Sequence, residues 1–213
     1  MDICSARFLM SNGRMRTYEI IAYNTQKDPV DLYLLNTEAS ASFHFPLNIC
    51  EVLLRNVIDR ILSAKFTENW HTNPQFHRMI DKYHRDKLSS SIDKYANKGD
   101  VITNLSLSFW VNLLSPKYAN IWKNCFYSSF LEYKAVNPRS NNPENALNAV
   151  YNQLKRINKL RNRIAHYEPI INKNIAVEYK QMLNVISYIN ADCAEWVQAK
   201  QQTEHYIKCI ADL

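Results

Sequence analysis

Residues 142–166 read NPENALNAVYNQLKRINKLRNRIAH, and their apolar side chains recur at the spacing of an amphipathic helix. Asn142 is a suitable N-cap, and Pro143 suits the first helical turn. At about 100° per residue, one broad face of this helix is apolar and should enter a core. Its members are Val150, Leu154, Ile157, Leu160 and Ile164. The stretch therefore predicts a packed helix over 143–167, called the motif helix after the segment RNRIAH at its end.

The rest of the chain shows the same helical spacing, with few of the alternating runs that indicate strands. Several prolines stand where a proline opens a helix. We expect helices over Pro29–Ser42, 46–66, 74–97, 101–114, 121–130, 143–167 and 175–211, the last with or without a break. The fold class predicted is all-α, a single-domain helical bundle spanning 1–213.

The composition excludes several classes of protein. Only two glycines occur, which argues against a Gly-rich phosphate loop or a dinucleotide fingerprint. The five cysteines are scattered and the histidines form no HxH or HExxH pattern, so we expect reduced thiols, no metal and no cofactor. No apolar run approaches the ~20 residues of a membrane span or the core of a signal peptide, which predicts a cytoplasmic protein without a membrane partner.

The opposite face of the motif helix is polar and basic. Lys155, Lys159, Asn162 and His166 share one stripe, and no acidic residue occurs from Tyr151 to His166. With a net charge of +6 for the whole chain, an anionic partner is plausible. Two interpretations remain open: the stripe holds a phosphate backbone, or it is an ordinary solvated helix face. His166, at the predicted helix end, is likewise either a general acid or base or a simple cap.

Arg161 stands inside the apolar arc of the motif helix rather than in its polar stripe. A guanidinium there keeps its charge and needs an anionic partner. The helix predicted from Pro46 carries a matching anomaly, because Glu51 lies among its apolar positions. We therefore expect Glu51 to support the site through an interhelical ion pair with Arg161.

Four blocks of the sequence resemble a known family. LRNRIAHYEPI (160–170) is similar to the signature of the Abi-like (abortive infection, AbiD/AbiF type) family of the HEPN superfamily, with Tyr167 where a second histidine is usual. DLYLLNTE (31–38), PLNICEVLLRN (46–56) and LSLSFW (105–110) resemble other blocks of that family, in the same order along the chain.

The resemblance implies an all-α HEPN domain and a homodimer in which two motifs face one composite cleft. It further implies a metal-independent endoribonuclease that acts as a toxin-like effector in antiphage defence, held silent by an inhibitory RNA or an antitoxin protein. By the same resemblance, His166 is the acid/base residue, Arg161 contacts the phosphate or supports the motif, and Asn162 orients His166. Lys155, Lys159 and Arg163 are the expected RNA-binding cations.

The roles expected of Arg161 and His166 conflict with helix geometry, and two other functions compete with that of an enzyme. On an ideal helix the side chains of Arg161 and His166 point about 140° apart. Either one of them acts from the helix end, or Arg163 or a partner subunit supplies the cation. The alternatives to an enzyme are a non-catalytic HEPN module that binds RNA or protein, with His166 as a cap, and a plain helical scaffold.

Overall fold

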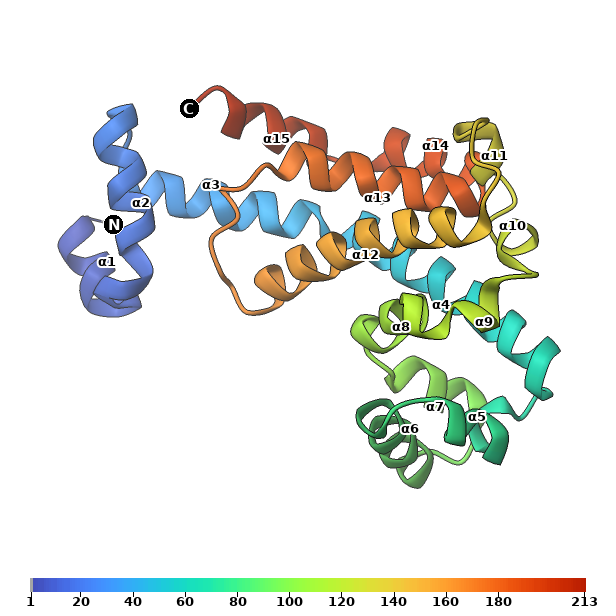
Figure 1. Ribbon diagram of the computed structural model, residues 1–213. Helices are drawn as coiled ribbons and strands as arrows, with labels where there is room; N and C mark the ends of the chain where they lie inside the picture. The colour runs from blue at the N-terminus through green and yellow to red at the C-terminus, as the bar shows by residue number, and fades with distance from the viewer. Residues whose placement is uncertain (1) are drawn as a thin grey trace.

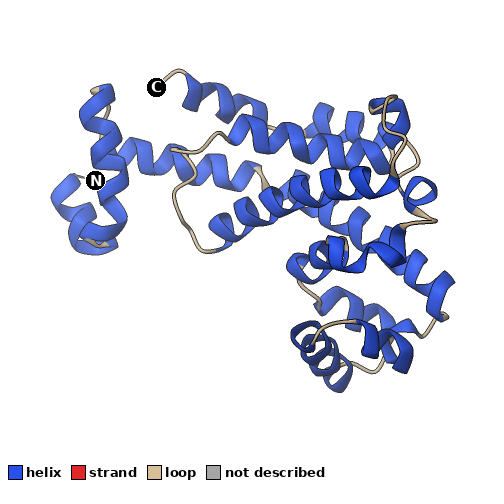
Figure 2. Ribbon diagram, in the orientation of Figure 1, coloured by secondary structure: helices blue, strands red, loops and turns tan. Residues whose placement is uncertain are grey.

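The computed structural model describes residues 2–213, and within them every regular element is helical, as predicted (Figure 2). The elements are α1 (Ile3–Met10), α2 (Asn12–Thr25), α3 (Pro29–Ser42), α4 (His44–Phe66), the 3-10 turn η1 (Trp70–Thr72), α5 (Pro74–Met79), α6 (Lys82–Lys94), α7 (Lys98–Asn104), α8 (Leu107–Leu113), the 3-10 turn η2 (Pro116–Tyr118), α9 (Ala119–Trp122), α10 (Phe126–Ser129), α11 (Tyr133–Val136), α12 (Pro143–Ala165), α13 (Ile175–Ile189), α14 (Ala191–Lys200) and α15 (Thr203–Ala211). The motif helix is α12, and in this part of the chain no helix is long and apolar enough to cross a membrane.

Helices that open on an Asx–Pro pair begin where the sequence predicts. The side chains of Asp28, Asn73 and Asn142 each accept hydrogen bonds from backbone N–H groups of the first turn, and a proline follows each of them. The cap satisfies donors that have no partner within the helix, while proline fixes a helical φ. α3 consequently has the predicted bounds, and α12 ends two residues before the predicted limit.

Four predicted helices are divided in the structure, and α1 and α2 were not predicted. The divided ones are those over 74–97, 101–114, 121–130 and 175–211, the last of which is expected with or without a break. The helix expected over 74–97 stops at Ile80, whose backbone is extended, because the Asp81 side chain accepts the His84 N–H and starts α6 anew. Leu105 is also extended and separates α7 from α8. Asn190 caps α14 in the same way, which divides the C-terminal stretch. At Asp81 and Asn190, local capping thus outweighs a continuous apolar pattern.

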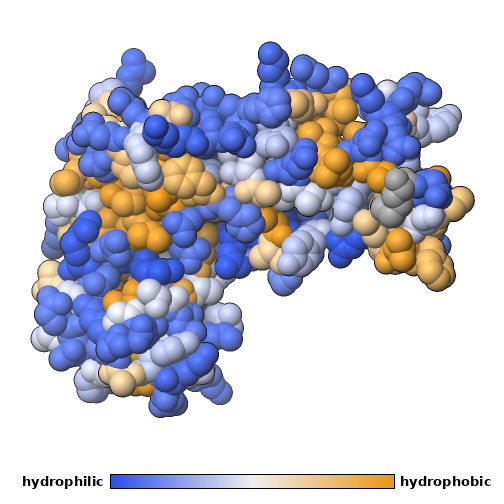
Figure 3. Space-filling model, turned by 180° about the vertical axis from the view of Figure 1, so that it is seen from behind, coloured by the Kyte–Doolittle hydropathy of each residue, from blue (hydrophilic) through white to orange (hydrophobic). Residues whose placement is uncertain are grey.

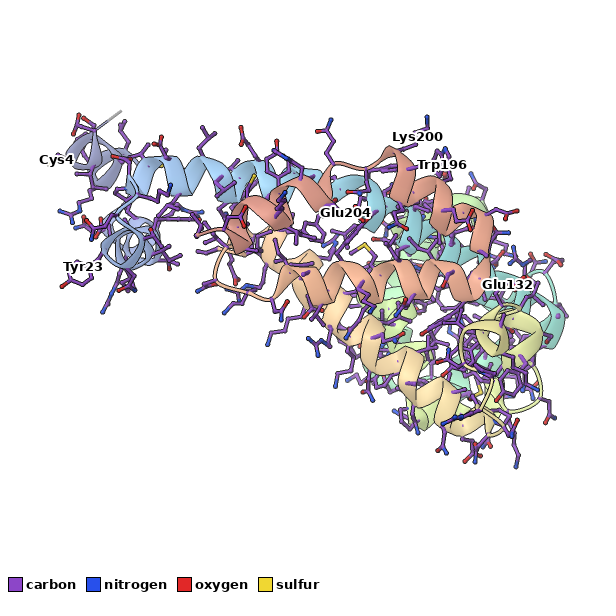
Figure 4. The ribbon with its side chains drawn as sticks, turned by 90° about the horizontal axis from the view of Figure 1, so that it is seen from above. Cys4, Tyr23, Glu132, Trp196, Lys200 and Glu204 are labelled. Atoms are coloured by element: carbon purple, nitrogen blue, oxygen red, sulfur yellow. The ribbon has the colours of Figure 1, made fainter. Side chains whose placement is uncertain are left out.

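The main hydrophobic core lies on the apolar face of α12. Val150, Leu154 and Ile157 are fully buried, and α12 packs against α13 on one side and against α8 and α9 on the other. α13 crosses α12 obliquely and also packs on α4 (Figure 1). α14 covers the outer side of this bundle, with Trp196 and Lys200 directed to solvent (Figure 4). The motif helix is therefore anchored by most of its length.

The N-terminal helices form an arm at the end of α3, far from α5–α8 (Figure 1). Ala6, Met15, Tyr18 and Leu32 make a small hydrophobic cluster there, and Ile171 joins it from the loop after α12. Ile210 of α15 packs against both this cluster and the main core. The arm is thus attached near the end of the motif helix. That the chain forms a single domain stays a prediction.

Candidate functional site

The motif helix ends in a tight reversal of the chain. The Glu168 N–H donates to the Arg163 carbonyl at 2.8 Å, and the Tyr167 N–H donates to the Ile164 carbonyl at 3.0 Å. This pair of bonds is a Schellman motif, which places the residue after the cap in the left-handed region. That residue is Tyr167, with φ 55°, and His166 is the cap itself. The reversal leaves both side chains exposed at the helix end.

Asn36 of α3 holds the chain that follows this reversal. Its Oδ1 accepts the backbone N–H groups of Ile170 at 2.7 Å and Ile171 at 3.0 Å, and the residue is only 5% exposed. Buried N–H groups need an acceptor, and neither of these belongs to a helix. The signal was present in the sequence, because Asn36 lies on the same face of α3 as the buried Leu32 and Ala39. Sequence reasoning did not assign it a role.

Two arginines reinforce the same loop. Arg14 of α2 donates from Nη1 to the Tyr167 carbonyl at 2.7 Å. Arg163 donates from Nε and Nη2 to the Pro169 carbonyl at 3.3 and 3.2 Å, and its Nη1 lies 3.4 Å from Glu168 Oε2. Arg163, expected to contact RNA, therefore also has a structural role. Nothing in the sequence around Arg14 indicated its contact with a residue 153 positions away.

The predicted ion pair between Glu51 and Arg161 is wrong. Glu51 Oε1 instead lies 3.0 Å from Nη2 of Arg55, one turn further along α4. A partner four residues away on one helix is within easy reach, and Glu51 sits at the margin of the apolar face rather than inside it. Arg161 is half-buried and makes no hydrogen bond or ion pair with any residue from 2 to 213. Its guanidinium therefore has no carboxylate partner among these residues.

His166 and Asn162 share the polar stripe but are joined only through the backbone. The His166 N–H donates to the Asn162 carbonyl at 3.0 Å. Among the described residues, the Asn162 side chain forms no hydrogen bond with the imidazole, so the expected orienting contact is absent within one chain. The Asn162 side chain instead faces a groove beside α8.

A basic groove of about 380 Å³ runs between α12 and α8. Its lining includes Lys155, Lys159, Asn162 and Arg163 from the motif helix and Asn112 from α8, with Glu168 as the acidic member. Ser108 and Asn158 bridge the two helices, with the Asn158 Nδ2 donating to the Ser108 Oγ at 3.0 Å. Lys155 and Lys159 are exposed and make no ion pair within residues 2–213. The groove is thus a cationic surface with amide groups, suited to an anionic chain.

A second hollow of about 400 Å³ adjoins this groove across Lys159 and Arg163. Arg156 lines it and pairs with Glu178 of α13, with Nη2 2.9 Å from Oε1. The hydrogen bond to Glu178 raises the pKa of Arg156. Lys173, from the loop before α13, adds a cation that sequence reasoning missed because it is remote from the motif helix.

In the part of the chain that the structure describes, no three His, Cys, Asp or Glu residues are grouped so as to hold a metal ion. Comparison with family models, with curated proteins and with solved structures gave no match for the chain.

Replacing Asn36 with alanine should lower the free energy of unfolding by about 2–4 kcal/mol, because two buried N–H groups lose their acceptor. Urea unfolding followed by circular dichroism measures the change. Glu38→Ala, an exposed change two residues along α3, should stay within about 0.5 kcal/mol. Equal stabilities of the two variants would contradict the role assigned to Asn36.

Replacing Tyr167 with glycine should raise the free energy of unfolding by about 1 kcal/mol. Tyr167 has a left-handed backbone and a side chain 77% exposed, so glycine removes a steric cost and little packing. Thermal unfolding of the two proteins checks this. A less stable glycine variant would mean that the tyrosine ring stabilises the fold in another way.

Proposed function

We propose that the chain is a metal-independent endoribonuclease of the Abi-like HEPN type. The observation that carries the proposal is that the side chains of Arg161 and His166 make no hydrogen bond or ion pair within residues 2–213, on the same helix that lines a groove with Lys155 and Lys159. Uncompensated cations next to an exposed histidine suit the binding and cleavage of a phosphodiester. The resemblance of 160–170 to the family signature supports the same conclusion.

The reaction proposed uses side chains alone. The neutral imidazole of His166 takes the proton of a ribose 2′-hydroxyl, whose oxygen attacks the adjacent phosphorus. Arg161 stabilises the charge that develops on the phosphoryl oxygens. The bond to the 5′ oxygen breaks, and that oxygen takes a proton from the histidine of a second subunit. The products are a 2′,3′-cyclic phosphate and a free 5′-hydroxyl, so DNA should resist cleavage.

A homodimer with a composite site would reconcile the positions of the two motif residues. Arg161 flanks the buried face of α12, whereas His166 caps its end on the exposed side. In one chain the two side chains therefore do not line a common groove. Two motif helices facing each other would bring the arginine of one subunit toward the histidine of the other.

The biological role proposed is that of a toxin-like effector in abortive infection, acting in the cytoplasm and restrained by an inhibitory RNA or an antitoxin protein. One observation favours the second candidate, a non-catalytic HEPN module that binds RNA or protein. In a single chain no polar side chain among residues 2–213 orients the His166 ring. The first experiment below distinguishes the two.

Replacing His166 with alanine should reduce RNA cleavage by at least about 100-fold, because the acid/base group is lost. Purified protein is incubated with total RNA in EDTA, and the ends are examined for 2′,3′-cyclic phosphate. His44→Ala, which removes another exposed histidine without hydrogen bonds to described residues, is the matched control and should cleave normally. Full activity or full growth arrest in His166→Ala would favour the non-catalytic module.

We expect Arg161 to act in the cleavage reaction and Arg163 to stabilise the loop after the motif helix. Arg161→Ala should slow cleavage by about 100-fold and change the free energy of unfolding by less than about 0.5 kcal/mol, since the Arg161 side chain has no hydrogen-bond or ion-pair partner within residues 2–213 to lose. Arg163→Ala should lower that free energy by about 1–3 kcal/mol, because the loop loses its donor to Pro169. Cleavage rates and urea unfolding of both variants test this. An unstable but active Arg161→Ala protein would reverse the assignment.

A further inference from the structure

A hollow of about 610 Å³ lies at the edge of the main core, where α4 meets α9, α10 and the end of α13. No residue of the motif helix lines it, so it is separate from the groove described above. Seen from behind, apolar side chains gather over the end of the bundle where α4 runs (Figure 3). Its volume lies within the range of ordinary small-molecule sites.

The floor of the hollow is aliphatic. Val57 and Ile121 are buried beneath it, and Ile61 and Ile189 are half-buried at its sides. Leu131 lines it while 67% exposed, although it belongs to a region dense in buried aromatic residues. Exposed aliphatic surface arranged around a hollow gains most from a ligand that removes it from water.

The rim of the hollow is cationic. Arg60 and Lys65 of α4 line it, and within residues 2–213 no carboxylate does. Arg60 makes no hydrogen bond or ion pair with any described residue. Lys65 donates from Nζ to the Asn120 carbonyl at 3.1 Å and retains two further N–H groups. Together with the Asn124 amide, the rim offers donors to an anion and no competing negative charge.

The serine and cysteine side chains of the lining donate to backbone carbonyls. The Ser128 hydroxyl donates to the Cys125 carbonyl at 2.9 Å, and the Ser129 hydroxyl donates to the same oxygen. The Cys125 thiol donates to the Ile121 carbonyl at 3.2 Å, and burial raises its pKa. A protonated thiol is a poor nucleophile, so the hollow is suited to reversible binding rather than covalent chemistry.

We propose that this hollow binds an amphipathic monoanion, a medium-chain aliphatic carboxylate. Its head lies on Arg60 and Lys65, and its tail lies on the aliphatic lining of Val57, Ile61, Ile121, Leu131 and Ile189. A sugar or a nucleobase would leave the aliphatic floor poorly matched. A neutral hydrocarbon would leave the cations without a counter-charge. Only a ligand with an anionic head and an aliphatic tail contacts both the cationic rim and the aliphatic floor.

Calorimetric titration of the full chain with octanoate, decanoate and decanol tests the proposal. Each buried methylene contributes up to about fourfold in affinity, so decanoate should bind about tenfold more tightly than octanoate. Decanol lacks the charge and should bind about three- to fivefold more weakly than decanoate. Arg60→Gln should remove that preference, and Ala64→Trp, which fills the hollow from an exposed position on α4, should weaken all three ligands at least tenfold.

Arg78→Gln is the matched control, because Arg78 is exposed and unpaired within residues 2–213 but lies outside the hollow. It should bind decanoate like the unaltered protein. Equal affinity for decanoate and decanol, or unchanged binding in Ala64→Trp, would overturn the proposal. Anionic phospholipid vesicles are titrated in parallel. Binding to vesicles without binding to free decanoate would also overturn the proposal, because the anion that the protein recognises would then be a phospholipid headgroup on a membrane surface.

Discussion

The position of the motif depends on one buried amide oxygen, Oδ1 of Asn36, which accepts two backbone N–H groups just after the reversal of the chain. The segment there leaves a helix and enters the interior, so its N–H groups have no helical acceptor. Asn36 supplies one from α3 and thereby fixes where α12 ends relative to α3. Ile171, the second of the two donors, then enters the small core of the arm. A single side chain thus couples the motif helix, α3 and the arm.

The same reversal of the chain determines which backbone carbonyls the neighbouring arginines contact. The reversal directs the Pro169 carbonyl toward Arg163 and the Tyr167 carbonyl toward Arg14, so both guanidinium groups are engaged by backbone oxygens. The Arg161 side chain has no such partner in the part of the chain that the structure describes. The helical wheel makes Arg161 the structural candidate, and the family resemblance makes Arg163 an RNA-binding cation. In the structure Arg163 holds the loop, while Arg161 is half-buried and has no ion pair within residues 2–213. The wheel describes the helix but not the loop that returns beside it.

Helix starts marked by an Asx–Pro pair could be predicted from the sequence, whereas breaks within a continuous apolar pattern and contacts between distant residues could not. The start of α12 follows from Asn142 and Pro143, and the basic stripe of Lys155 and Lys159 follows from helical periodicity. The break before α6 is different, because Asp81 also bonds the Tyr118 hydroxyl, 37 residues away. The false pairing of Glu51 with Arg161 has the same origin. Helical periodicity shows that two charged residues stand among apolar positions, but it does not show which residue each of them contacts.

The charges of the motif helix fall into two groups once every partner is known. Arg156 is compensated by Glu178 and Arg163 by Glu168, so neither contributes a full positive charge to the surface. Lys155, Lys159 and Arg161 have no such acid within residues 2–213, and they occupy the C-terminal half of one rigid helix. Uncompensated cations on a fixed scaffold lose little conformational freedom when an anion binds. The uncompensated positive charge of this helix therefore lies on Lys155, Lys159 and Arg161, whereas Glu168 offsets the charge of Arg163, the cation nearest to His166 along the helix.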